Sequence, residues 1–146
     1  MSTRHPGTQF DGGCRILVVD DERSIAQLAA LMLRRQGWKV EIACHPADAL
    51  EMFGDGSGFD LVVSDFVMPE MNGCEMVAAM RRRKPDLAAV FISGYAEEIA
   101  KCHCPLLSKP FRADDLVEHV RKGLAAIVPT CTGDRIPGNR LALAMA

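Results

Sequence analysis

Three carboxylates, one hydroxyl and one ammonium stand directly after short apolar segments of this chain. They belong to Asp20, Asp21, Asp65, Ser93 and Lys109. Three carboxylates in one pocket repel each other, so at least one would take up a proton unless a cation neutralised them. Mg²⁺ binds one or two carboxylates together with carbonyl and water oxygens, and it shares phosphate oxygens readily. The residue types therefore indicate a divalent-cation site that can handle a phosphate group.

An aspartate beside such a cation can attack phosphorus and form an aspartyl phosphate. Negative charge then spreads over the transferring oxygens, and Lys109 together with the cation would neutralise it. The hydroxyl of Ser93 would donate a hydrogen bond to a phosphoryl oxygen. This chemistry requires that side chains far apart in the sequence meet at one place.

The segments that must bring them together alternate between strand-like and helix-like patterns. The predicted strands are 15–19, 38–43, 59–64, 87–92 and 106–107. The predicted helices are 24–36, 46–53, 72–83 and 112–127. The strands are short apolar runs rich in β-branched residues. The first helix has an apolar stripe at 3.6-residue spacing, formed by Ile25, Leu28, Ala29, Met32 and Leu33.

Strict alternation of strands and helices predicts an α/β fold with a parallel sheet and right-handed crossovers. Ligands of such open sheets bind beyond the carboxyl ends of the strands. All five chemistry-bearing side chains follow a predicted strand, so we expect them at one edge of the sheet.

The composition indicates a soluble globular domain. Of 146 residues, 49% are hydrophobic and 25% are charged, and the net charge of −2 gives no general attraction to nucleic acid or membranes. No apolar run approaches the roughly 18 residues of a membrane span, and residues 1–13 lack the apolar stretch of a secretory signal. We therefore expect a cytoplasmic protein with six reduced cysteines. We expect a folded domain at 14–127 between a disordered tail, 1–13, and a C-terminal tail, 128–146.

Four motifs resemble those of the response-regulator receiver domains of two-component signalling. They are ILVVDD at 16–21, DFVMPEMNG at 65–73, SGY at 93–95 and KPF at 109–111. The resemblance is specific because the four occur in order, each at a predicted strand end. The last two favour receivers of the hybrid histidine kinase type.

The resemblance implies a flavodoxin-like (βα)5 three-layer sandwich with strand order 2-1-3-4-5. It implies that Asp65 is the phospho-acceptor and that Asp21 and Asp65 are direct ligands of Mg²⁺ (or Mn²⁺). Asp20 would bind the ion through water, and the backbone carbonyl of Val67 would be the third protein ligand. It also implies that Lys109 pairs with the phosphoryl group, that Ser93 is the switch hydroxyl, and that Lys109–Pro110 is a cis peptide.

A receiver takes its phosphoryl group from a phosphohistidine on a sensor histidine kinase or a histidine phosphotransfer protein. The implied function is signalling rather than enzymatic turnover. Phosphorylation would switch a surface that contacts a downstream protein partner. A homodimer is compatible with this function. We expect no direct binding to nucleic acid or membrane. Because no output domain follows residue 127, the chain would act by protein contact or be part of a hybrid kinase or regulator.

Three features depart from the family pattern. Leu106 stands where receivers usually carry an aromatic residue, which puts the aromatic switch in doubt. Only 15 residues separate Ser93 from Lys109, which predicts a shortened fourth helix around 96–101. Val67 and Tyr95 occupy the positions that border the path of the hydrolytic water, and neither can orient water. This predicts slow self-dephosphorylation.

Three other functions remain open from the sequence. The first is a pseudo-receiver that binds partners without phosphorylation. The second is a phosphohydrolase of the haloacid dehalogenase type, although Val67 stands where that family has an acid. The third is a thiol–metal protein built on residues 102–104, Cys-His-Cys, although a second ligand pair at zinc spacing is missing. The basic run 81–84 could bind nucleic acid, but its position at a helix C-terminus favours stabilisation of the helix dipole.

Overall fold

The computed structural model describes residues 14–56, 58–94 and 106–126. Their strands are β1 (Arg15–Val19), β2 (Lys39–Ala43), β3 (Leu61–Asp65), β4 (Ala88–Ser93) and β5 (Leu106–Ser108). Their helices are α2 (Arg23–Arg34), α3 (Pro46–Phe53), α4 (Gly73–Arg81) and α6 (Ala113–Ala125). These elements agree in type and order with the sequence prediction, and their ends differ from it by at most two residues.

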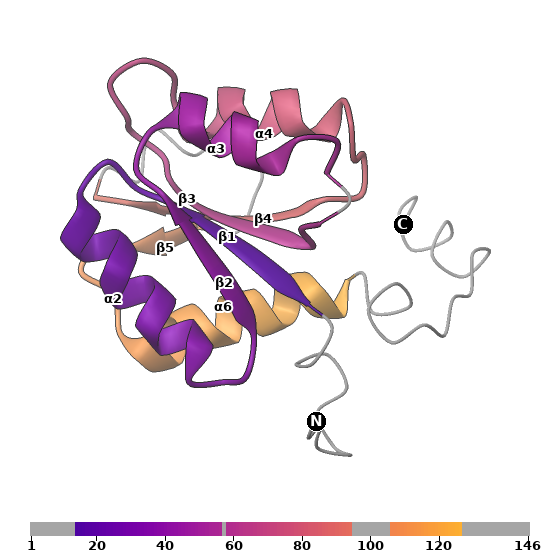
Figure 1. Cartoon of the computed structure of the whole chain (residues 1–146). Coiled ribbons are helices and arrows are strands. Elements are labelled where there is room, and N and C mark those ends of the chain that lie inside the picture. Colours follow the sequence, from indigo (N-terminus) through magenta and orange to yellow (C-terminus); the bar gives the residue numbers. More distant parts are fainter. Residues whose placement is uncertain (1–13, 57, 95–105, 127–146) are drawn as a thin grey trace.

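The five strands form one parallel sheet with the order β2-β1-β3-β4-β5, as predicted. Helices α2 and α6 cover one face of the sheet, and α3 and α4 cover the other (Figure 1). The described residues therefore form a three-layer α/β sandwich. None of the described helices is long and apolar enough to cross a membrane.

Each face of the sheet has its own apolar core, because successive side chains of a strand point to opposite faces. On β1, Ile16 and Val18 join the core under α2 and α6, whereas Leu17 and Val19 join the core under α3 and α4. A sheet buried on both faces requires apolar residues at every position. This explains why the central strands read as apolar runs up to the polar residues at their carboxyl ends.

The buried face of α2 differs from the predicted stripe. The helix buries Ala26, Ala29, Ala30 and Leu33, whereas Leu28 is 46% exposed. The prediction for Leu28 was therefore wrong. Two stripes of the same spacing exist on this helix, and the one that contains three alanines packs on the sheet.

Helix α4 begins directly after the loop that follows Asp65. The side chain of Asn72 accepts a hydrogen bond from the backbone N–H of Glu75 (2.8 Å), and the Glu75 side chain accepts one from the backbone N–H of Asn72 (3.0 Å). This reciprocal capping box fixes the first turn of α4. At the other end, Arg81 and Arg83 donate to the backbone carbonyls of Leu87 and Gly54. These arginines tie the end of α4 to neighbouring loops, and their interaction with the helix dipole stays a prediction.

Leu106 is half-buried and packs against the core under α3 and α4. The predicted fourth helix and both tails lie outside the described residues. The boundaries of the 14–127 domain remain a prediction.

Gly73 should be intolerant of a side chain, because a Cβ there would lie 2.7 Å from the Asp65 carbonyl oxygen and 2.9 Å from Ser64 Oγ. Alanine normally favours a helix over glycine. We nevertheless expect Gly73→Ala to lower the free energy of unfolding by about 1–3 kcal/mol, measured by urea denaturation. Gly58→Ala is the control, because its Cβ would meet only Arg15 Nη1, at 3.9 Å. Equal stability of the two variants would contradict the close packing of α4 on the end of β3.

Candidate functional site

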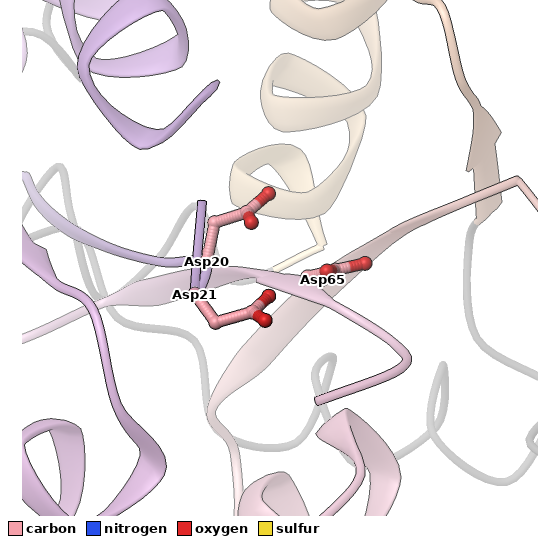
Figure 2. Close-up of side chains that lie close together, drawn as sticks. All are labelled: Asp20, Asp21 and Asp65. Atoms are coloured by element: carbon pink, nitrogen blue, oxygen red, sulfur yellow. The ribbon is translucent and has the colours of Figure 1, made fainter. Parts of the chain in front are cut away.

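Three aspartates converge at the carboxyl ends of β1 and β3 (Figure 2). Asp20 and Asp21 follow β1, and Asp65 is the last residue of β3. The two strands are hydrogen-bonded neighbours, with Val19 opposite Ser64. One carboxylate oxygen from each aspartate lies within 4.8 Å of the other two. The sheet thus brings together the three acids that the sequence singled out.

Two hydrogen bonds with the backbone fix the position of Asp20 in this cluster. Its backbone N–H donates to the carbonyl of Ala43 (3.2 Å), and its Oδ1 accepts a hydrogen bond from the backbone N–H of Glu22 (2.8 Å). Its Oδ2 is buried and has no hydrogen-bond partner among the described residues. A buried, unpartnered carboxylate oxygen is costly unless a charge compensates it.

Lys109 supplies the positive charge of the site. Its Nζ lies 3.4 Å from Asp65 Oδ1 and 3.6 Å from Asp20 Oδ2. Its backbone N–H donates to the carbonyl of Ser93 (3.0 Å), which ties the residue after β5 to the end of β4. The predicted cis peptide at Lys109–Pro110 is confirmed.

Ser93 is the last residue of β4 and is buried. It pairs with Ser108 across the sheet, one residue before Lys109. All five chemistry-bearing residues of the sequence thus follow or end strands at the same edge of the sheet.

Burial dominates the electrostatics of the carboxylates. Burial, together with the negative charge of Asp20, raises the pKa of Asp65 to about 6, although Lys109 acts in the opposite direction. Burial also raises the pKa of Asp20. Burial alone would lower the pKa of Lys109, but the charges of Asp65 and Asp20 outweigh it and raise this pKa. The Lys109 ammonium therefore stays charged. Its single positive charge does not fully compensate the buried carboxylates of Asp20 and Asp65.

Sequence reasoning missed one residue of the site. Glu22 lies at the start of α2, and its Oε1 is 3.8 Å from Lys109 Nζ. In the sequence, Glu22 stands out only as the third consecutive acidic residue after β1. Such a run is, on its own, typical of a solvated turn. Three carboxylates, those of Asp20, Glu22 and Asp65, thus lie within 3.8 Å of the Lys109 ammonium.

The donor set fits a hard divalent cation. All its side-chain ligands are carboxylate oxygens, one of them buried without a hydrogen-bond partner, and their mutual repulsion is only partly offset by Lys109. An acidic site of this kind suits Mg²⁺ better than a softer metal.

The model of the response regulator receiver domain family matches residues 16–121, which is most of the chain. The chain belongs to this family. It is a signalling domain rather than an enzyme that turns over a substrate.

Two curated relatives from Brucella abortus show how such domains are used. The sensor kinase CckA is 34% identical over 124 residues, which cover 80% of this chain but only 13% of the kinase. The response regulator receiver protein CpdR is 33% identical over 118 residues, covering 77% of this chain and 98% of CpdR. Receivers similar to this one therefore occur both inside a long kinase and as a protein of nearly their own length.

A solved relative carries a ligand of the expected kind. The response regulator TrrA from Thermotoga maritima, crystallised in complex with Mg²⁺–BeF, is 31% identical. The match covers 75% of this chain and 97% of TrrA, with a TM-score of 0.67. Together with the acidic cluster, this similarity suggests a Mg²⁺ site.

Some sequence predictions are wrong or stay untested. Cys74 is disulfide-bonded, so the expectation of six reduced cysteines is wrong for this residue. Val67 lies two residues after Asp65 with a half-exposed side chain, and the ligand role of its carbonyl stays a prediction. Tyr95 and the Cys-His-Cys run at 102–104 lie outside the described residues.

The raised pKa of Asp65 predicts a pH-dependent stability. The folded state favours the neutral carboxyl, so its stabilising contribution is lost as pH rises from about 4 through about 6. In the absence of divalent metal, we expect the stability of Asp65→Asn relative to wild type to grow by about 1–2 kcal/mol between pH 4.5 and 7.5, measured by urea denaturation.

Saturating Mg²⁺ at pH 7.5 is the control, because a bound cation should stabilise the wild type more than the variant. A stability difference that stays constant with pH would show that Asp65 is not held towards its neutral form.

Proposed function

We propose that Asp65 accepts a phosphoryl group from a phosphohistidine and that this switches a protein-interaction surface. The observation that carries the proposal is the position of Lys109 Nζ, 3.4 Å from Asp65 Oδ1 within a cluster of three aspartates. At that distance, the Asp65 carboxylate can attack the phosphorus of a phosphoryl group while the Lys109 ammonium contacts an oxygen of the same group.

In the transfer, a carboxylate oxygen of Asp65 forms a bond to phosphorus while the P–N bond to the donor imidazole breaks. A pKa of about 6 leaves most of the Asp65 carboxyl ionised at neutral pH, as a nucleophile requires. The Lys109 ammonium neutralises charge that develops on the transferring oxygens. No proton transfer to Asp65 is needed.

The proposed cation is Mg²⁺, with Mn²⁺ as a substitute. Asp21 and Asp65 would hold it directly, Asp20 would hold it through water, and the carbonyl of Val67 would complete the protein ligands. When bound, the ion supplies positive charge to the carboxylates and to the phosphoryl oxygens. The buried Oδ2 of Asp20, which accepts no hydrogen bond from the described residues, supports this assignment.

Ser93 is the proposed switch residue. A phosphoryl group on Asp65 would add charge and acceptor oxygens, and the Ser93 hydroxyl would move to donate a hydrogen bond to one of them. The backbone bond from Lys109 N–H to the Ser93 carbonyl links that movement to the segment after β5. The end of β4 and the segment after β5 are therefore joined, and we expect phosphorylation to shift both together.

The proposed donor is a sensor histidine kinase or a histidine phosphotransfer protein, and the proposed output is contact with a downstream protein. The family and the match to a sensor kinase support the donor class. We also propose a cytoplasmic location, and the proposed function is compatible with a homodimer. A pseudo-receiver and a dehalogenase-type hydrolase are the rivals, and the presence of Lys109 beside Asp65 favours phosphorylation over the first.

Incubation with acetyl phosphate and Mg²⁺, followed by intact-protein mass spectrometry, tests the acceptor. We expect one added phosphoryl group on the wild type and none on Asp65→Asn, because the amide is not a competent nucleophile. Asp86→Asn is the matched control, since Asp86 precedes β4 and pairs with Lys84 (3.9 Å) away from the cluster. A wild type that never gains the group would favour the pseudo-receiver, and a labelled Asp65→Asn would place the acceptor elsewhere.

The half-exposed Val67 side chain predicts a long-lived phosphoryl group, because valine cannot orient an attacking water. We expect Val67→Asn to lose its phosphoryl group several-fold faster than the wild type. The measurement is the decay of the phosphorylated mass after removal of acetyl phosphate, with Val67→Ala as the control for side-chain size. A wild-type lifetime of only seconds would contradict slow self-dephosphorylation.

A further inference from the structure

Glu22 is a fourth carboxylate at the site, and none of the proposed phosphorylation chemistry uses it. Its Oε1 lies 3.8 Å from Lys109 Nζ. Although Glu22 occupies the N-cap position of α2, its side chain makes no cap hydrogen bond. The local fold of the helix therefore does not account for the direction of this side chain.

The exposures of the charged groups show on which side of the ammonium Glu22 lies. The side chains of Asp20 and Asp65 are 3% and 8% exposed, whereas that of Glu22 is 63% exposed. Glu22 therefore lies on the solvent side of Lys109, where a phosphodonor must approach. Its backbone N–H donates to Asp20 Oδ1, which keeps the residue at this place.

We propose that Glu22 determines which phosphodonors the site accepts, by disfavouring small dianionic donors. The Glu22 carboxylate repels an incoming dianion and competes with it for the ammonium of Lys109. A small donor that carries a protonated nitrogen, such as phosphoramidate at neutral pH, has less net negative charge and meets less repulsion. This inference rests on Asp65 being the phospho-acceptor.

Two small phosphodonors of different net charge test whether Glu22 acts through its charge. Acetyl phosphate is a dianion at neutral pH, and transfer breaks its P–O bond and releases acetate. Phosphoramidate is a net monoanion with a protonated nitrogen, and transfer breaks its P–N bond and releases ammonia. In both cases the new bond joins phosphorus to a carboxylate oxygen of Asp65, so the two reactions differ in donor charge and leaving group.

The experiment compares initial phosphorylation rates of the wild type, Glu22→Gln and Glu22→Asp with both donors, at Mg²⁺ saturating for each protein. We expect Glu22→Gln to raise the rate with acetyl phosphate by about three- to tenfold, and the rate with phosphoramidate by a clearly smaller factor. The gain should shrink as salt is raised, because about 1 M salt shortens the screening length to about 3 Å. Glu22→Asp keeps the charge and should keep the wild-type ratio of the two rates.

Glu51→Gln is the matched control, because it removes the same charge from an exposed position on α3 and should leave both rates unchanged. A Glu22→Gln effect that is equal for both donors, or that is insensitive to salt, would overturn the inference while leaving Asp65 as the acceptor. Failure of both donors to label the wild type at Asp65 would instead overturn the proposed function.

Discussion

The repulsion among buried carboxylates at one edge of the sheet is the constraint on which the rest of this structure depends. Asp20 and Asp65 are almost inaccessible to water, yet they lie beside Asp21 and share one ammonium. A globular domain tolerates such a cluster only when positive charge compensates it. Lys109 compensates part of the negative charge, and the remainder favours the binding of a divalent cation.

The fold provides what this charge arrangement needs. Parallel strands place their carboxyl ends at one edge, and the neighbouring positions of β1 and β3 bring acids 45 residues apart into one cluster. Unbroken apolar runs bury both faces of the sheet and hold the strand ends in place. The close packing of Gly73 on the Asp65 carbonyl couples β3 to α4. The position of Asp65 and the start of α4 are therefore mutually constrained.

Sequence patterns predicted most of this arrangement because strong local signals coincided with it. The start of α3 was predictable because Pro46 suits the first turn of a helix. The position of Asp65 followed from the apolar run that it terminates. Leu28 was misplaced because two stripes of equal spacing lie on α2, and only packing against the sheet decides between them. Glu22 was missed because its distance from Lys109 depends on the path of a lysine 87 residues away.

A complex with beryllofluoride and Mg²⁺ tests the central claim most directly, because beryllofluoride mimics a phosphoryl group bonded to a carboxylate. The measurement is a crystal structure of the wild-type protein grown with both. The account predicts beryllium bonded to a carboxylate oxygen of Asp65, the metal on Asp21 and Asp65, and the Lys109 ammonium against a fluoride. Beryllofluoride bound to another residue, or Lys109 turned away into solvent, would contradict it.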